Sequence, residues 1–580
     1  MLRFLLLRLK HASCSEILFR ARQRAGSFRI KRWARSGRRF PVPEPEPEAV
    51  RLLVLPAGYP AVTWERVEAL LEGERFTLNT DAATLRAWER AHAIGAPGAA
   101  RGDLRTVWEP ARLQHLALLL AYPGSGDDPG QERARRYLLE DLMRWLDAHP
   151  FPFGPHYLSA MECGLRIPVF LGALKAGPDP GELRRLGEAL YLHARWIEAN
   201  LSLYSSLGNH TVCEALGLLY AGTLFRTDRS GARWLDTGCR LLDQELCRQV
   251  LPDGGALEQS LSYHRFVLDL YWLALGFIEG NGLGGCPGWR ERLTAGESFL
   301  AAVTDSSGGI PALGDSDDGW VIAPGLQPER AVVPPPPPGV YRFPDAGYTV
   351  YRGQELLITF DHGPLGMPPL NNHGHADALS VTVSLGGIPF LVDPGTFRYN
   401  GEPVWRRYFK GTRAHNTVCV DGADQAVQQT GFVWSSPFAC SVEGFAAGED
   451  GSLLVAASHD GYLRLPGKVR HRRTLQVAPD GTCRIEDRFL GGGTHRYELN
   501  FHFHPEVEIS RGDGCWLARR GGRVLALELS GGVLRRGEEE PPLGWFSAAY
   551  NRKEPAPVLQ AGRQGVPGEV VFQTILRALQ

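Results

Sequence analysis

The chain has 580 residues, too many for one ordinary hydrophobic core, so we expect two or three domains. Its 43% hydrophobic and 22% charged residues are typical of a soluble globular protein, and no apolar run approaches the roughly 18 residues of a membrane span. The formal net charge of −1 indicates no general attraction to nucleic acid, so no nucleic-acid partner is expected and any basic binding surface must be local.

The ten cysteines are scattered without a CxxC pair, which argues against a thiolate metal site or a disulfide framework. Near the N-terminus a short apolar run is interrupted by Arg8 and Lys10, so it is too short for a clear secretory signal. These features leave the compartment open between the cytoplasm and the periplasm of a bacterium.

Residues 1–50 form a basic segment followed by a spacer. Between Arg3 and Arg39 there are twelve Lys or Arg and one acidic residue, Glu16. This run favours a solvated helix face, with weak attraction to an anionic polymer or membrane surface as the alternative. The Pro/Glu stretch at 41–50 predicts a stiff, extended spacer.

From residue 51 to 333 the sequence predicts a helical domain. Apolar residues recur at three- and four-residue steps in successive segments, which are 111–122, 133–149, 186–201, 214–225 and 265–279. Helices paired in series suggest an incomplete (α/α) toroid, in which each pair buries its apolar stripe against its neighbours.

A proline run at 333–339 marks the expected domain boundary, because proline lacks the amide hydrogen that helices and central strands need. The pattern beyond it alternates apolar and polar residues between Gly-rich turns, as in RYELNFHFHP (496–505). We therefore predict an antiparallel β-sandwich over 340–580, and an α+β multidomain chain overall.

The stretch from Asn371 to Thr417 carries most of the residues suited to metal or proton chemistry. If 373–375 is extended like a strand, His373 and His375 point the same way. Two imidazoles and one carboxylate, from His375, Asp393 and His415, can converge on one divalent cation with water completing the shell. The alternative is that these side chains fill turns or bond to the backbone.

Three motifs in this stretch, HGHADALS, LVDPGTF and RAHNTV, resemble the heparinase II/III-like domain of polysaccharide lyases. Upstream, NHTVCE resembles the family motif N-H-x-x-x-E, and DGGALEQSLSYH resembles D-G-G-x-x-E-x-S-x-x-Y-H. The resemblance covers roughly residues 100 to 580 and implies a helical toroid followed by a β-sandwich. It also implies an anionic, uronic-acid-containing polysaccharide as the partner.

The resemblance further implies roles for individual residues. His375, Asp393 and His415 would hold one structural divalent metal, zinc first and manganese or calcium as alternatives. The first histidine of the pair, His373, would face the substrate. Asn209, helped by His210, would engage the substrate carboxylate, and Tyr263 would abstract or donate the proton. Taken alone, Asn209 can equally cap a helix, and Tyr263 can be an ordinary boundary tyrosine.

Such a lyase removes the weakly acidic C5 proton of a uronic acid and expels the 4-oxygen of the next sugar by β-elimination. The reaction needs a group that neutralises the carboxylate, a base and an acid. A phenol titrates near pH 10, so a basic Tyr263 needs a nearby cation or donor. His264, His373 and His210 are the candidates for that task.

Further substrate contacts are expected from the segment resembling the family's W-E-x-x-R helix. Trp108 would stack on a sugar, and Glu109 and Arg112 would lie toward the cleft, where Arg112 can bind a carboxylate or sulfate. The alternative is a packing tryptophan beside an intrahelical ion pair. Tyr408 and His264 are also candidate substrate contacts, whereas the acidic stretch GDSDDG at 314–319 is interpreted as a turn rather than a calcium loop.

The expected activity is thus that of a lyase acting on heparan sulfate, hyaluronan, chondroitin or a bacterial exopolysaccharide. Two alternatives stay open. A glycoside hydrolase on a similar helical barrel needs two carboxylates flanking the bond, for which Glu109, Glu162, Glu214 and Glu258 are available. The other is a carbohydrate-binding or assembly protein without catalytic activity.

Overall fold

The computed structural model describes residues 13–38, 40–45, 62–122 and 128–579. The apolar run around Arg8 and residues 46–50 of the spacer lie outside these ranges, so the interpretations given for them stay predictions. The chain forms two compact units, neither of them continuous in sequence. The first comprises residues up to Gln249, Phe266–Leu293 and Gly319–Ala331, and the second comprises Val250–Arg265, Thr294–Asp318 and Val332–Gln580.

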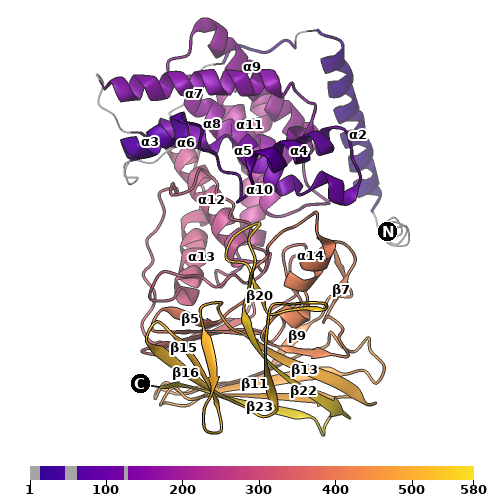
Figure 1. Ribbon diagram of the computed structural model, residues 1–580. Coiled ribbons are helices and arrows are strands. Elements are labelled where there is room, and N and C mark those ends of the chain that lie inside the picture. Colours follow the sequence, from indigo (N-terminus) through magenta and orange to yellow (C-terminus); the bar gives the residue numbers. More distant parts are fainter. Residues whose placement is uncertain (1–12, 39, 46–61, 123–127, 580) are drawn as a thin grey trace. The chain divides into compact units, whose positions relative to one another are not determined.

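The first unit is helical (Figure 1). Its elements are α2 (Cys14–Arg35), α3 (Trp64–Leu71), α4 (Ala82–Ala93), η2 (Gly98–Arg101), α5 (Leu104–Ala111), α6 (Gln114–Leu120), α7 (Pro129–Ala148), η3 (Pro155–Tyr157), α8 (Ala160–Leu174), α9 (Pro180–Ala199), α10 (Asn209–Leu224) and α11 (Arg229–Gln249). Two further helices, α12 (Leu261–Asn281) and α13 (Trp289–Val303), contribute residues to both units.

Helices α8 to α11 pack in series: α8 contacts α9 and α10, and α10 contacts α11. Glycines permit the close approach of α8 and α10. A Cβ on Gly164 would lie 2.5 Å from the carbonyl oxygen of Cys213, and one on Gly217 would lie 2.9 Å from the Cα of Gly164. The basic helix α2 has no buried residue along its fully described length, which agrees with the predicted solvated helix face.

The second unit is built mainly of antiparallel sheets (Figure 1). The strand orders are β1-β2-β3-β4-β5, then β14-β15-β16-β23-β12-β11-β10-β9, and β17-β22-β13-β6. The bounds of these strands are β1 (Gly339–Phe343), β2 (Tyr348–Arg352), β3 (Leu356–Asp361), β4 (Val381–Leu385), β5 (Ile388–Leu391), β6 (Val418–Val420), β9 (Cys440–Ala447), β10 (Leu453–His459), β11 (Arg470–Val477), β12 (Cys483–Leu490), β13 (His495–His502), β14 (Glu508–Arg511), β15 (Trp516–Arg520), β16 (Arg523–Leu529), β17 (Gly532–Arg536), β22 (Pro557–Gly565) and β23 (Val571–Leu579).

Short two-residue strands and two short helices complete the described part of this unit: β7 (Val427–Gln428), β8 (Trp434–Ser435), β18 (Glu538–Glu539), β19 (Pro542–Leu543), β20 (Trp545–Phe546), β21 (Glu554–Pro555), α14 (Pro403–Phe409) and η4 (Thr412–Ala414). Buried residues alternate with more exposed ones along strands such as β11 and β12, as the period of two predicts.

All three large sheets contribute to one hydrophobic core, which includes Ile358 of β3, Leu475 of β11 and Leu499 of β13. The structure therefore confirms the predicted fold class, a helical toroid followed by an antiparallel β-sandwich. None of the helices in the described ranges combines the length and apolar character needed to cross a bilayer.

Candidate active site

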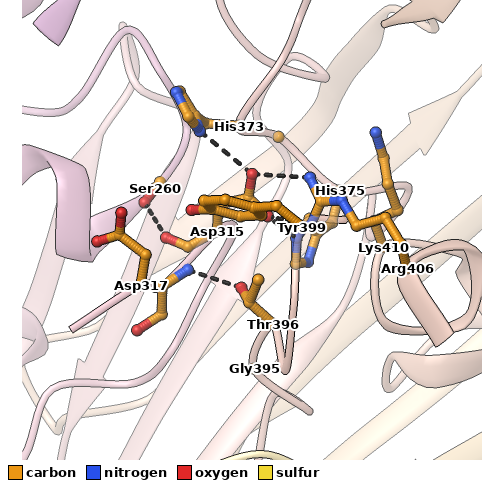
Figure 2. A network of polar contacts seen from close by, with 12 residues as sticks. Ser260, Asp315, Asp317, His373, His375, Gly395, Thr396, Tyr399, Arg406 and Lys410 are labelled. Carbon is orange, nitrogen blue, oxygen red and sulfur yellow. Dashed lines mark hydrogen bonds and ion pairs between the residues drawn. The ribbon is translucent and has the colours of Figure 1, made fainter. Parts of the chain in front are cut away.

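A buried carboxylate, Asp315, lies at the centre of a polar network in the second unit (Figure 2). The guanidinium of Arg406 binds both of its oxygens, at 2.5 and 2.8 Å. His373 Nδ1 lies 3.1 Å from Oδ2, and His375 Nε2 lies 3.1 Å from Oδ1. Burial raises the pKa of Asp315, but Arg406 and the two imidazoles outweigh it and hold that pKa well below its usual range.

The backbone around Asp315 is held between two other segments of the second unit. The Asp315 amide donates to the His373 carbonyl at 2.9 Å, and the Ser260 hydroxyl donates to the Asp315 carbonyl at 2.6 Å (Figure 2). Gly314 has a φ of +67°, and a Cβ there would lie 2.2 Å from the Gln259 carbonyl. This position therefore requires glycine, and Asp315 is presented to both histidines in one fixed orientation.

Tyr263 and His373 lie against each other. Their rings stack with centroids 3.9 Å apart and planes inclined by 26°. The Tyr263 hydroxyl donates to Asp317 Oδ2 at 3.0 Å and lies 3.0 Å from the Tyr399 hydroxyl. The other ring nitrogen of His373, Nε2, lies 3.6 Å from a carboxylate oxygen of Glu258. The phenol expected to transfer the proton and the imidazole expected to face the substrate are thus neighbours, each beside a carboxylate.

The predicted metal ligands also converge. His375, Asp393 and His415 are buried and each offers one ligand atom within 4.8 Å of the others. Among the described residues, His375 Nδ1 and His415 Nε2 have no hydrogen-bond partner, although both are buried. Burial lowers the pKa of His375 to about 4, which keeps its imidazole neutral, the form that binds metals. The donor set therefore fits a divalent ion.

Both histidines of the predicted metal site, His375 and His415, form hydrogen bonds with carboxylates, as metal-binding histidines commonly do. Asp315 Oδ1 accepts a hydrogen bond from His375 Nε2, and Asp393 Oδ2 lies 2.8 Å from His415 Nδ1. Metal-binding imidazoles commonly make such a bond through the nitrogen that does not coordinate the ion. For His375 this leaves Nδ1 as the ligand atom.

The segment carrying His373 and His375 is irregular rather than a strand, so the strand-based reason for their common direction is wrong. Their neighbours hold the segment instead: its backbone bonds to Asp315 and, through the amide of Ala376, to the Lys410 carbonyl at 3.0 Å. The two imidazoles meet because both bind one carboxylate, through different ring nitrogens.

Two family models match this chain. Residues 176–287 match the model described as heparinase II/III N-terminus, and residues 335–572 match the model described as heparinase II/III-like, C-terminal. The chain belongs to the heparinase II/III-like family. The resemblance seen in the sequence is confirmed.

Known heparinase II/III-like proteins resemble the chain over part of their length. A heparin-sulfate lyase of Bacteroides stercoris is 33% identical over 382 residues, which cover 61% of this chain and 54% of that protein. One from Pedobacter heparinus is 25% identical over 251 residues, 39% of this chain and 38% of that protein. The chain thus matches about half the length of the first relative and less of the second.

Solved structures of the family share the fold. A crystal structure of heparinase III superposes with a TM-score of 0.69 at 17% identity, covering 96% of this chain and 89% of that one. The structure of a heparan sulfate lyase from Pedobacter heparinus gives a TM-score of 0.56 at 17% identity. At this identity the likeness concerns the fold alone.

The family motif N-H-x-x-x-E begins α10 in the first unit. Gly208, with a φ of 88°, is the N-cap, so the interpretation of Asn209 as the cap is wrong. Asn209 is buried and His210 is half-buried. Glu214 ends the motif and accepts from the amide and the hydroxyl of Ser202 at 2.7 and 2.8 Å. Burial raises the pKa of Glu214 to about 8.

Of the three predicted contacts in the family's W-E-x-x-R segment, Glu109 and Arg112 are buried and Trp108 is half-buried, all in the first unit. Arg112 binds both oxygens of Glu162 at 2.9 Å and contacts Glu109 at 3.2 Å. Glu109 also pairs with Arg105, and the Trp108 indole donates to the Pro155 carbonyl at 2.9 Å. These charges are satisfied by one another, as expected for the ion-pair interpretation.

His264 and Tyr408 are buried in the second unit. Burial lowers the pKa of His264 to about 3, so it stays neutral and supplies no charge to activate Tyr263. The Tyr408 hydroxyl accepts from the amides of Gly544 and Trp545 at 3.0 and 3.2 Å. In this structure Tyr408 therefore fixes a loop, and Tyr399 is the tyrosine that reaches Tyr263.

Sequence reasoning missed Asp315, Asp317 and Tyr399 as parts of the site. The acidic stretch 314–319 was interpreted as a turn, but it supplies both Asp315 and Asp317. The signal was present in the spacing of these two residues, since alternate positions of an extended segment face the same side. Sequence analysis gave Arg406 no role in the site, because its partner Asp315 is 91 residues away in the sequence.

Proposed function

We propose that this member of the heparinase II/III-like family is a polysaccharide lyase that cleaves uronic-acid-containing chains by β-elimination. The observation that carries the proposal is the stacked pair of Tyr263 and His373, with the phenol bonded to Asp317 and Tyr399. The names of the relatives support it, since the two described above are heparin-sulfate lyases. Heparan sulfate is therefore the first substrate class to test.

We assign the proton transfers to the stacked pair. In β-elimination the C5–H bond breaks, its electrons form the C4–C5 double bond, and the C4–O bond breaks toward the leaving sugar. One of Tyr263 and His373 takes the C5 proton and the other protonates the leaving oxygen. Asp317, which accepts from the phenol at 3.0 Å, is placed to take the Tyr263 proton when the phenol acts as the base.

Asp315 is assigned a positioning role for this pair. Its bond to His373 Nδ1 favours the tautomer with a proton on that nitrogen, which leaves Nε2 to exchange a proton with substrate. Asn209, with His210, is assigned the neutralisation of the substrate carboxylate from its motif in α10. The sequence-based pairing of these residues with Tyr263 stays a prediction.

His375, Asp393 and His415 are proposed to hold one divalent ion. Two imidazoles with one carboxylate suit zinc, whereas calcium and magnesium prefer oxygen ligands alone. When bound, the ion would cross-link three chain segments and supply structural rigidity. The proton transfers are left to the protein side chains.

The reaction can be tested on a panel of heparan sulfate, hyaluronan, chondroitin, alginate and bacterial exopolysaccharides. We expect an unsaturated uronate that absorbs in the ultraviolet, and loss of about 100-fold or more in rate for Tyr263→Phe and for His373→Ala. New reducing ends without this absorbance would indicate a hydrolase, and neither signal would indicate a binding protein. Full activity in both variants would disprove the residue assignments.

A further inference from the structure

We propose that the helical unit holds a second divalent-cation site, formed by Glu89, His149 and His156, for a transition ion of the zinc type. All three residues belong to the first unit, whereas the family's metal ligands belong to the second. The two sites share no residue. Each of the three offers one ligand atom, and these atoms all lie within 4.8 Å of one another.

The distances between the ligand atoms suit one ion. Glu89 Oε1 lies 3.0 Å from His156 Nε2 and 3.6 Å from His149 Nδ1. A tetrahedral zinc ion with bonds of about 2.0 Å separates neighbouring ligand atoms by about 3.3 Å, midway between these two values. The two imidazole planes are inclined by 80° with centroids 4.4 Å apart, so the rings approach the carboxylate from different directions.

Hydrogen bonding alone does not complete this cluster. At 3.0 Å the contact from Glu89 to His156 is a hydrogen bond, but 3.6 Å from Glu89 to His149 is too long for one. His156 is 3% exposed, and its Nε2, the nitrogen that faces Glu89, is the ligand atom nearest the carboxylate. A cation bound between the three side chains would bring His149 into the cluster.

The ligands come from three elements whose positions are fixed by other contacts. Glu89 lies in α4, His149 is the C-cap of α7, and His156 lies in η3. Arg166 donates to the His156 carbonyl at 2.8 Å, and the Trp108 indole donates to the neighbouring Pro155 carbonyl. The loop that carries the most buried ligand is therefore set before any ion binds, which lowers the cost of ordering the site.

One side of the site opens into a cavity of about 330 Å³ that all three ligands line. The two arginines at this cavity, Arg75 and Arg144, both pair with Asp141, at 3.3 and 3.0 Å. Asp141 thus compensates the charges of both arginines, so neither of them pairs with Glu89, whose carboxylate can bind the cation. A three-ligand site beside a cavity keeps one coordination position for water.

The site can be tested by measuring zinc on the full chain. The protein is stripped with a chelator and titrated with Zn²⁺ against a fluorescent zinc indicator, and bound zinc is also counted after dialysis. We expect Glu89→Gln and His149→Ala each to lower the zinc content by one ion per chain. Their affinity at this site should fall by at least about 10- to 100-fold, the loss caused by removing even an outer-shell partner.

Matched variants separate this site from the family's metal site. His92→Ala removes another histidine of α4 that does not belong to the cluster, and it should keep the full zinc content. His415→Ala should remove one ion on its own, and its effect should add to that of His149→Ala. Because Glu89→Gln keeps an acceptor for His156, circular dichroism should show an unchanged fold in this variant.

Unchanged zinc content and affinity in both Glu89→Gln and His149→Ala would overturn the proposal and leave a hydrogen-bonded cluster that ties α4 to η3. Loss of zinc in these variants but not in His415→Ala would support the new site. It would also show that the proposed site at His375, Asp393 and His415 binds no zinc. The readout is metal content, so it holds whether or not the chain is a lyase.

Discussion

At the scale of single residues, Asp315 connects two kinds of chemistry. One carboxylate binds the imidazole assigned to proton transfer and the imidazole assigned to the metal, and Arg406 neutralises it. A buried charge left without its partner is costly, so the Asp315–Arg406 pair makes the arrangement sensitive to small changes.

Asp315→Asn should lower lyase activity and zinc affinity together. The amide keeps the shape of the carboxylate but has one acceptor oxygen, so it cannot serve Arg406 and both histidines. We expect zinc affinity at the His375 site to fall by about 10- to 100-fold and kcat to fall while KM changes little, because the role proposed for Asp315 is to orient His373 and not to contact substrate. Asp513→Asn, at an exposed position, is the control. Unaltered zinc affinity would contradict the positioning role.

Glu214 predicts a pH dependence of stability. Burial raises its pKa from 4.5 in the unfolded chain to about 8 in the folded protein, so the folded state binds more protons between these values. The free energy of unfolding should therefore fall as pH rises through this window, by about 1.4 kcal/mol per pH unit for one extra proton bound.

This can be tested by measuring the Tm of the wild type and of Glu214→Gln between about pH 5 and about pH 9, a range that spans the two pKa values. The variant does not titrate at this position, so its Tm should fall less as pH rises. Glu65→Gln, at an exposed site, should follow the wild type. A wild type and Glu214→Gln variant with parallel pH profiles would show that Glu214 is ionised in the fold.

At the scale of elements, strands β11 and β12 support the loop that carries the candidate metal ligand His415. Arg473 of β11 binds both oxygens of Asp487 of β12, at 2.7 and 3.0 Å. It also donates to the carbonyls of Leu379 and Asn416, at 2.7 and 2.6 Å. Asn416 follows His415 directly, so the sheet holds this ligand through a buried guanidinium.

Arg473→Met should destabilise the chain by about 3–5 kcal/mol, because it leaves Asp487 buried without its cationic partner. Chemical denaturation gives the free energy of unfolding, and zinc titration of the folded variant reports on the His415 loop. Arg484→Met, at an exposed position of β12, should stay within about 0.5 kcal/mol of the wild type. Equal stability of the two variants would contradict this role for Arg473.

At the scale of the whole molecule, the compact units do not follow the order of the chain. The second unit takes Val250–Arg265 and Thr294–Asp318 from the helical part of the sequence. These segments carry Tyr263, Asp315 and Asp317, which contact His373 and Tyr399. A boundary drawn at the proline run therefore marks the change from helices to strands, while the candidate active site uses residues from both sides of it.

The sequence by itself determined the fold class, because the periods of apolar residues and the positions of proline are local properties. Through family motifs it also predicted the trio His375, Asp393 and His415, and it gave His373 as one of three histidines that could lie beside Tyr263. It did not determine the partners of these residues. Asp315 is 58 residues from His373 and 91 from Arg406, and Glu89 is 67 from His156. Contacts over such separations depend on the path of the chain in space, so only the tertiary structure decided which charges meet.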